Sequence, residues 1–229
     1  MKRIVAGLMV LIAGLASMAA TQNWLGTVER TPASHLVGNP DAPVTVTEYI
    51  SYTCPHCRDF TLQGEEILKV GYVQPGDLRF EYRHVAANII DMTATMLAFC
   101  GAPEKFPRNH AALMAAQPQF NALRRMATKS QTDRWTNGDL AARRRAVASD
   151  LNLYAILEQR GYSRSELDQC LADQALADRI ESAIAQDVEK YGPIPTPSFA
   201  VNGQMLENVH GWERLSQVLA SPLPAAPSE

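Results

Sequence analysis

The chain has 229 residues, of which 46% are hydrophobic and 20% charged, and its formal net charge at pH 7 is −3. This composition is typical of a globular protein in water, and the length allows one large domain or two small ones. The weakly negative charge gives no sign of the basic surface that nucleic acid binding requires, so we expect no nucleic acid partner.

Residues 1–20 have the pattern of a secretory signal peptide. Lys2 and Arg3 form a basic start, residues 4–15 are a short apolar run, and residues 17–19 fit the small-x-small pattern of a cleavage site. The apolar run is short for a membrane span, and a retained signal anchor is the alternative. We therefore predict export to an oxidising compartment, the periplasm.

Residues 21–43 are expected to form an extended lead-in. They contain three prolines and show no clear hydrophobic period. The segment is too short and too rich in proline for an oligomerising coiled coil, so we expect a monomer.

A strand is predicted from residue 44 to residue 52, where one face is apolar except for Glu48. Buried acids are rare unless they are paired or functional, so Glu48 is a candidate functional residue. The alternative is that Glu48 lies at an edge and faces water. A helix is predicted from residue 55 to about residue 70, with Ile67 among the residues that face inward.

Where this strand gives way to the helix, the chain has the sequence Cys54-Pro55-His56-Cys57. If Cys54 is the helix cap, unpaired backbone N–H groups point at its sulfur, and Pro55 suits the first helical position because it has no N–H. The partial positive charge of a helix start favours a thiolate, and His56 can add a cation nearby. Cys57 lies on the same turn, close enough to form a disulfide. We predict a redox pair in which Cys54 attacks and Cys57 resolves.

A second strand is predicted over residues 78–85 and closes a first α/β segment, 44–87. From residue 88 to residue 191 the pattern is helical. One helix in this segment is predicted over residues 106–117, ended by Pro118.

Strands are predicted again near the C-terminus. Residues 198–201 and 204–206 flank Asn202-Gly203, which is a strong hairpin signal. A last helix follows over residues 212–220, and residues 221–229 are expected to be a flexible tail. The fold class is therefore α/β: the segments 44–87 and 192–220 share one sheet, and 88–191 is an inserted all-helical domain.

These features resemble the DsbA family of periplasmic thiol–disulfide oxidoreductases, which have a thioredoxin-like fold with an inserted helical domain. The resemblance covers roughly residues 40–220. It depends on the Cys-Pro-His-Cys tetrad after a strand, an acid six residues before the first cysteine, a Thr-Pro step before a short strand, and an Asn-Gly hairpin: Cys54–Cys57, Glu48, Thr196-Pro197 and Asn202-Gly203.

The resemblance implies roles for three further residues. Pro197 would have a cis peptide bond and lie against the active-site sulfurs, and Thr196 with Pro197 would form the substrate platform; an ordinary trans turn is the alternative. Glu48 would move a proton to or from Cys57. The Pro-His dipeptide favours an oxidase. Thr196 leaves the choice between oxidase and isomerase open, and Pro195 departs from the small or aliphatic residue that is common in the family.

We therefore expect a disulfide donor that acts on unfolded or folding exported proteins through a mixed disulfide. A DsbB-like membrane reoxidase would restore the Cys54–Cys57 disulfide. No dissociable cofactor is expected, because the disulfide carries the electrons. The alternatives are an isomerase or reductase on the same fold, and a periplasmic binding or chaperone protein in which the Cys-x-x-Cys pair is structural.

Two more cysteines, Cys100 and Cys170, fall in the helical segment. In an oxidising compartment we favour a structural disulfide between them over two separate buried thiols. No metal site is predicted, because the histidines lack ligand spacing and the 54–57 segment joins its own candidate ligands too tightly for a tetrahedral site.

Overall fold

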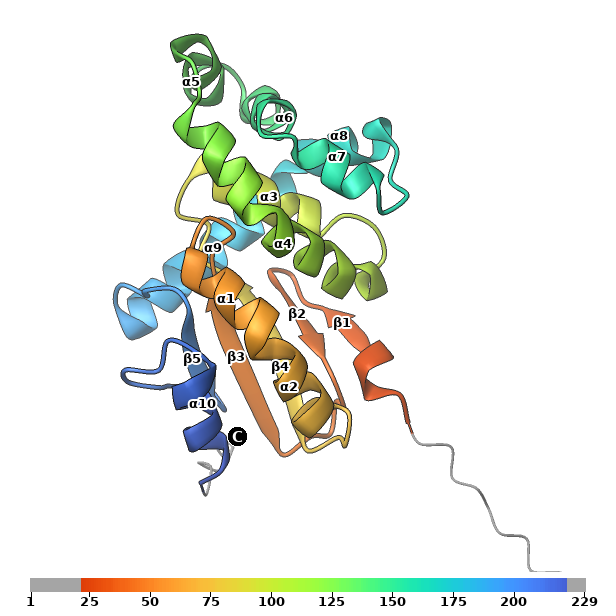
Figure 1. The fold of residues 1–229 in the computed structure, drawn as a ribbon, viewed down its shortest axis with the longest axis vertical. Coiled ribbons are helices and arrows are strands. Elements are labelled where there is room, and N and C mark those ends of the chain that lie inside the picture. Colours follow the sequence, from red (N-terminus) through yellow and green to blue (C-terminus); the bar gives the residue numbers. More distant parts are fainter. Residues whose placement is uncertain (1–21, 222–229) are drawn as a thin grey trace, which may run out of the picture.

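A computed structural model describes residues 22–221 of the chain (Figure 1). The predicted signal peptide and nearly all of the predicted tail lie outside these residues. The described part contains a mixed six-stranded sheet with the order β1-β2-β4-β3-β5-β6. Its strands are β1 (Val28–Arg30), β2 (Ser34–Val37), β3 (Val44–Ile50), β4 (Leu78–His84), β5 (Ser198–Val201) and β6 (Gln204–Met205).

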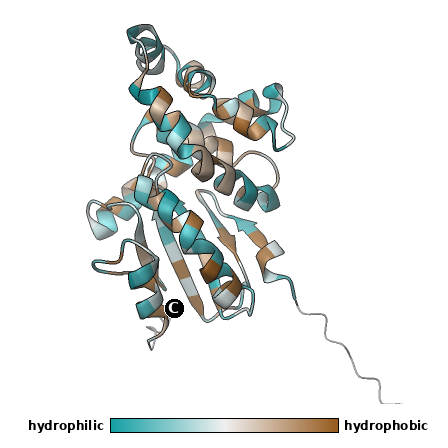
Figure 2. Ribbon diagram, viewed as in Figure 1, coloured by the Kyte–Doolittle hydropathy of each residue, from teal (hydrophilic) through white to brown (hydrophobic). Residues whose placement is uncertain are grey.

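The centre of the sheet is the parallel pair β3 and β4, and the other neighbouring strands run antiparallel. A parallel pair needs a crossover connection, and here α1 (Pro55–Gln63), α2 (Glu65–Leu68) and η2 (Lys69–Val73) supply it. Helix α10 (Trp212–Leu219) lies beside α1 in front of the sheet in Figure 1. In Figure 2 the strands carry bands of hydrophobic colour, as expected for strands that are covered by helices.

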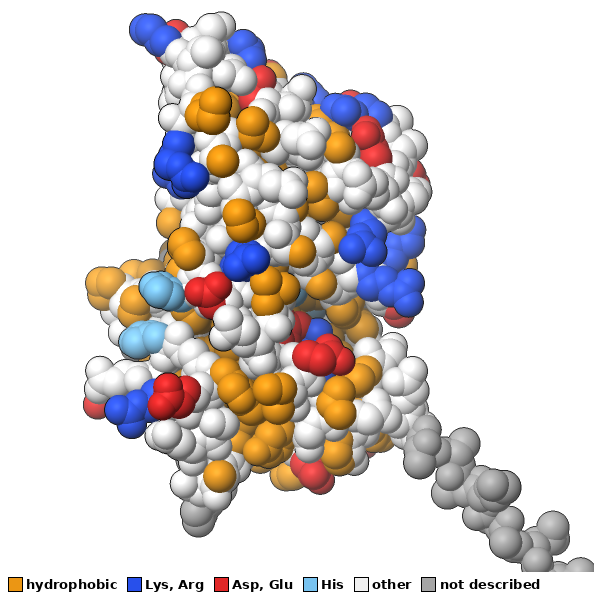
Figure 3. Space-filling view, in the orientation of Figure 1, with side chains coloured by type: hydrophobic (Ala, Val, Ile, Leu, Met, Phe, Trp, Pro, Cys, Tyr) orange, Lys and Arg blue, Asp and Glu red, His pale blue; other side chains and the backbone are white. Residues whose placement is uncertain are grey.

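The expected helix over residues 55–70 is broken at Gly64. A Cβ atom at this position would lie 2.5 Å from the Cβ of Trp212, so only glycine lets α10 approach this closely. After the break, Leu68 is buried, but Ile67 is 52% exposed, so the prediction that Ile67 faces inward was wrong. Figure 3 shows apolar side chains gathered over α1 and α2 on the face it draws.

The lead-in predicted for residues 21–43 is not a plain extended segment. It contains a 3-10 turn (Trp24–Gly26) and the strands β1 and β2. Strand β2 pairs with β4 from Ser34 opposite Arg83 to Val37 opposite Phe80, and it buries the side chain of His35. These strands are only three and four residues long, which is too short to show a period in the sequence.

Helices fill the chain between β4 and β5, and most of them stand above the sheet in Figure 1. The largely hydrophilic α5 lies at the top of this layer in Figure 2. The helices are α3 (Ile89–Ala98), the 3-10 turn η3 (Pro103–Lys105), α4 (Phe106–Arg125), α5 (Lys129–Thr136), α6 (Leu140–Asp150), α7 (Leu153–Glu158), α8 (Arg164–Ala172) and α9 (Gln174–Tyr191).

Helix α4 does not end at Pro118, as the sequence predicted, but continues for seven residues to Arg125. A proline inside a helix removes one backbone hydrogen bond. The continuation buries Phe120 almost completely, and this apolar burial offsets the lost bond. Among residues 22–221, no helix is long and apolar enough to span a membrane.

Cys100 and Cys170 are joined by a disulfide, with their Cα atoms 5.6 Å apart. The bond links the end of α3 to α8 across a sequence separation of 70 residues. The Cys100 carbonyl also accepts hydrogen bonds from the Tyr162 hydroxyl at 2.6 Å and from the Asn109 amide at 3.2 Å. The disulfide and these two hydrogen bonds therefore connect the end of α3 to α8, to α4 and to the segment before α8.

Replacing Cys100 and Cys170 together by serine is expected to lower the free energy of unfolding by about 4 kcal/mol, because the unfolded chain regains the freedom of a long loop. Denaturant unfolding of the variant and the parent protein measures this difference. A change below about 1 kcal/mol would show that the bond contributes little beyond the packing around it.

Candidate active site

The cysteine pair lies where β3 gives way to α1. Strand β3 ends at Ile50, residues 51–53 form a turn, and α1 begins at Pro55. Cys54 is the N-cap residue, with an extended backbone (φ −86°, ψ 118°). The first N–H groups of a helix have no partner within the helix, and here those of His56 and Cys57 point at the Cys54 sulfur.

These contacts lower the pKa of the Cys54 thiol to about 5. The largest cause is the hydrogen bond from the Cys57 side chain, and partial burial opposes it. Hydrogen bonds from the Thr196 side chain and from the two backbone N–H groups contribute as well. Cys54 is therefore largely a thiolate at neutral pH and is partly open to solvent.

Cys57 is the opposite kind of thiol. It is fully buried, and burial raises its pKa far above the usual range. The hydrogen bond to Cys54 and the closeness of the acidic groups of Glu48 and Cys54 raise it further, while the Ser51 N–H, 3.4 Å from the sulfur, acts the other way. Two thiols on one helical turn thus differ sharply in acidity and in access.

Glu48 lies in the middle of β3, between β4 and β5, and is fully buried. The alternative of a water-facing edge position is therefore wrong. Neither carboxyl oxygen has a hydrogen-bond partner among the described residues. Burial, followed by the charge of Glu65, raises the pKa of Glu48 well above its usual value, so this carboxyl holds its proton. A protonated acid beside Cys57 can give a proton to a departing thiolate.

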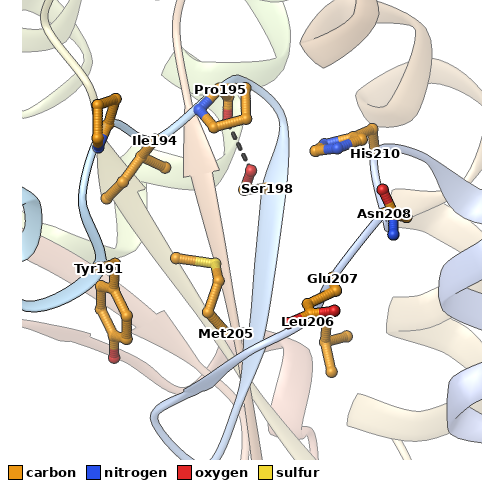
Figure 4. Close-up of a pocket in the computed structure, with 10 residues that line it drawn as sticks. Tyr191, Ile194, Pro195, Ser198, Met205, Leu206, Glu207, Asn208 and His210 are labelled. Carbon is orange, nitrogen blue, oxygen red and sulfur yellow. Dashed lines mark hydrogen bonds between the residues drawn. The ribbon is translucent and has the colours of Figure 1, made fainter.

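The loop before β5 faces the cysteines from across the site. The Thr196–Pro197 peptide bond is cis, and the thiol of Cys54 donates to the Thr196 carbonyl. His210 Nδ1 lies 2.8 Å from the Pro197 carbonyl, so the segment before α10 contacts this loop as well. A cavity of about 300 Å³ adjoins the loop (Figure 4). Its walls include Ile194, Pro195, Met205, Leu206 and His210.

His56 contributes a backbone contact to the site, and the cation predicted from its imidazole stays a prediction. Its side chain is exposed, and its backbone N–H is the group directed at the Cys54 sulfur. Pro55 takes the first helical position, as its missing N–H predicts. The helix start thus supplies two contacts to the Cys54 sulfur, in addition to the larger contribution from the Cys57 thiol.

The sequence did not reveal the polar groups that the inserted helices bring to the site. Asp91 from α3 contacts Ser51 and Tyr52, and the Gln117 amide from α4 donates to the Cys54 carbonyl at 2.8 Å. A buried acid in the first turn of a helix resembles any helix-capping acid in the sequence. Only the packing of α3 against the turn distinguishes Asp91.

A second buried cluster lies behind Glu48. Glu65 pairs with Lys69, and its other oxygen lies 3.4 Å from His110 Nε2. Burial opposes ionisation of Glu65, but Lys69 and His110 outweigh it and hold its pKa below the usual range. Glu65 is thus charged and Glu48 neutral. Within residues 22–221, no three His, Cys, Asp or Glu side chains are grouped as a metal site requires.

The fold and the paired thiols define a thiol–disulfide exchange site on a thioredoxin-like sheet. A family model described as Thioredoxin matches residues 30–221, so the chain belongs to this family. The predicted fold class, thioredoxin-like α/β with added helices, is therefore confirmed.

Two solved structures show which kinds of thioredoxin-like protein this chain resembles. A solved protein-disulfide isomerase from Novosphingobium aromaticivorans is 40% identical, with a TM-score of 0.78 over 82% of this chain and 96% of that chain. Wolbachia pipientis α-DsbA1 shares the fold, with a TM-score of 0.66 at 19% identity, covering 83% of this chain and 91% of that one.

A Rickettsia bellii protein, provisionally named a protein-disulfide oxidoreductase, is 26% identical over 76% of this chain and 58% of its own length. The chain therefore spans a little over half the length of the curated relatives it matches first. The resemblance to DsbA-like thiol–disulfide oxidoreductases is confirmed, and the relatives support a protein-disulfide oxidoreductase of this type.

Proposed function

We propose that this protein donates the Cys54–Cys57 disulfide to exported proteins. A client thiolate attacks the Cys54 sulfur, the bond to Cys57 breaks, and Cys57 leaves as a thiolate that takes a proton. The second client thiolate then attacks the client sulfur of the mixed disulfide, and Cys54 leaves as a thiolate. The client loses two electrons and two protons, and the enzyme pair gains the two electrons.

One observation carries this proposal: the unequal acidity of the two thiols. A Cys54 pKa of about 5 makes its sulfur a good leaving group and stabilises the reduced protein. A disulfide whose reduced form is stabilised is a strong oxidant. The buried Cys57 cannot meet a client directly, so the mixed disulfide forms at Cys54.

Glu48 and the cis-proline loop complete the proposed mechanism. The neutral carboxyl of Glu48 supplies the proton that Cys57 needs when it leaves. The backbone of Thr196 and Pro197, which borders Cys54, holds an extended client segment by main-chain hydrogen bonds.

The proposal extends to the setting of the reaction. The protein works in the periplasm as a monomer, on unfolded or folding exported proteins, and a DsbB-like membrane protein reoxidises it. No dissociable cofactor takes part. The support for this setting is the predicted signal peptide and the resemblance to the DsbA family.

The test is the reduction potential of the Cys54–Cys57 pair, measured by equilibration with glutathione. A disulfide donor is expected to have a potential more positive than about −180 mV. A value below about −270 mV would contradict the proposal, because such a pair is a reductant.

An isomerase is the second candidate, and it is favoured by the 40% identical Novosphingobium protein, which is named a protein-disulfide isomerase. An assay with a scrambled-disulfide client and an assay with a fully reduced client separate the two activities. A donor oxidises the reduced client and leaves the scrambled one inactive, whereas an isomerase reactivates the scrambled client.

The reduced protein is expected to lose stability as the pH falls through about 5. The Cys54 pKa is about 5 in the folded protein, below the usual value of about 8.5 for an unfolded chain. Between these two pKa values the folded reduced protein binds fewer protons than the unfolded chain. The stability that Cys54 contributes is therefore complete above the unfolded pKa of about 8.5, and it is lost as the pH falls through the folded pKa of about 5. Because Cys54 is partly exposed, solvent screening limits the gain at neutral pH to about 1–2 kcal/mol.

The oxidised protein has no thiol at this position and serves as the control. Denaturant unfolding of both forms from about pH 4 to about pH 9 should show their stability difference shrinking on acidification. A difference that stays constant over this range would contradict the lowered Cys54 pKa.

A further inference from the structure

Asp91 is a fully buried acid that the proposed reaction does not use. It lies in the first turn of α3, where Asn88 is the N-cap and accepts from the Ile90 and Asp91 N–H groups. The helix start is therefore already capped, and the Asp91 carboxyl is not needed for that purpose. Instead, Asp91 faces the turn that leads from β3 to the cysteines.

Both carboxyl oxygens of Asp91 hold that turn. The Ser51 hydroxyl donates to Oδ2 at 2.5 Å, and the Tyr52 N–H donates to Oδ1 at 2.7 Å. These bonds favour the ionised form, but burial is stronger and raises the pKa of Asp91 to about 7. No Lys, Arg or His of the described residues forms an ion pair with it.

The turn that Asp91 holds contacts both cysteines. The Ser51 N–H points at the Cys57 sulfur from 3.4 Å, and the Ser51 carbonyl accepts from the Cys54 N–H at 3.2 Å. The Ser51 hydroxyl also accepts from the Thr53 N–H at 3.2 Å. Ser51 is thus the residue through which Asp91 acts on the pair, because its side chain meets Asp91 and its backbone meets both cysteines.

We propose that Asp91 is a positioning residue that holds the Ser51 turn so that Cys57 attacks the Cys54 mixed disulfide efficiently. In that step the Cys57 thiol gives up its proton, which passes to solvent or to the leaving thiolate, and its sulfur bonds to the Cys54 sulfur. The bond from Cys54 to the partner sulfur breaks, and the partner leaves as a thiolate that holds the electron pair. This inference rests on the proposed thiol–disulfide exchange.

The physical reason is effective concentration. Two groups on one turn react fast only if their approach is fixed, and a displacement of about 1 Å can cost roughly 10²-fold. Without Asp91, the Ser51 hydroxyl and the Tyr52 N–H lose their buried acceptor. The turn then relaxes, and the Ser51 N–H leaves the Cys57 sulfur.

Equilibration of the full-length protein with glutathione measures the effective concentration of Cys57 toward the Cys54 mixed disulfide. Acid-quenched mixtures contain reduced protein, the Cys54–glutathione mixed disulfide and oxidised protein. Two constants follow: the first describes formation of the mixed disulfide, and the second describes its resolution by Cys57. The second is the effective concentration of Cys57. For Asp91→Ala we expect the second constant to fall roughly tenfold or more, since positioning is lost.

The first constant should change by less than about twofold, because Cys54 keeps its own contacts with the helix start and with Thr196. Asp91→Asn should retain most of the second constant, since its amide oxygen still accepts from the turn. Asn109→Ala is the matched control: Asn109 is equally buried in the inserted helices, but it contacts Cys100 and Tyr162. It should lose stability with the second constant unchanged.

An unchanged second constant in folded Asp91→Ala would overturn the inference, as would an equal loss in Asn109→Ala. If Asp91→Ala does not fold, Ser51→Ala decides, because it removes the same hydroxyl link from the other side; a second constant equal to that of the parent protein would overturn the inference. If the parent protein itself forms no mixed disulfide with glutathione, the proposed function fails, which is a distinct result.

Discussion

Cys54→Ser and Cys57→Ser are expected to behave in opposite ways toward a disulfide-containing peptide at neutral pH. The Cys57→Ser protein keeps the partly exposed, acidic thiol of Cys54, so it should attack the peptide and accumulate as a mixed disulfide. The Cys54→Ser protein keeps a thiol that is buried and has a raised pKa. It should react more slowly by roughly 10³-fold or more, because the nucleophile has been removed.

Mass spectrometry of quenched samples measures both rates. The same variants unfolded in guanidinium chloride are the control, and there the two thiols should react at similar rates, since the fold no longer distinguishes them. If the folded Cys54→Ser protein reacted rapidly with the peptide, Cys54 could not be the attacking sulfur. Such a result would also contradict the proposal that Cys54 reacts with the client and Cys57 resolves the mixed disulfide.

These roles could be predicted from the sequence because the relevant residues lie close together in the chain. The Cys-x-x-Cys spacing places Cys54 and Cys57 on one helical turn, and the proline at the first helical position marks the helix start. Glu48 stood out as an acid on the apolar face of a short strand. Each of these signals depends on local periodicity or on a single turn, which a sequence records directly.

Contacts between distant segments could not be found in this way. Asp91 lies 40 positions from Ser51, and in the sequence it is only an acid near a helix start. The pairing of β2 with β4 likewise joins residues that are far apart, and a strand of four residues has no measurable period. The inserted helices were predicted as a separate block, yet α3 and α4 supply the side chains that hold the turn and the Cys54 carbonyl.

The prediction that α4 ends at Pro118 was wrong for a similar reason. Local rules end a helix at a proline, and they are correct for an isolated segment. In the folded protein α4 continues because Gln117 and Phe120, on either side of Pro118, are both buried. Tertiary packing therefore outweighs the local cost, and the site depends on it, because Gln117 binds the Cys54 carbonyl.

Glu48→Gln is expected to make the protein slower but more stable, a combination that a merely structural residue would not give. Glutamine has nearly the same shape as the protonated carboxyl but cannot supply a proton at neutral pH. Reduction of the Cys54–Cys57 disulfide by a dithiol should therefore slow by roughly 10²-fold, the usual worth of a positioned proton donor. The loss should be greatest at neutral and higher pH, where Cys57 has no other ready source of protons.

The gain in stability follows from the raised pKa of Glu48. The folded protein keeps this proton above the pH at which the unfolded chain releases it, near about 4.3 for a free glutamate side chain. In that range the native state binds more protons than the unfolded state, so stability falls as the pH rises. Glutamine has no proton to release, and the variant should escape this loss at neutral pH.

Glu66→Gln is the matched control, because Glu66 lies on the neighbouring helix α2 but is exposed. It should leave both the rate and the stability close to those of the parent protein. Stopped-flow tryptophan fluorescence follows the reduction, and denaturant unfolding follows the stability. A Glu48→Gln protein that is reduced at the parental rate would rule out Glu48 as the proton donor to Cys57. The buried carboxyl would then have no part in the proton transfer, and the proton would have to come from water that enters beside Cys54.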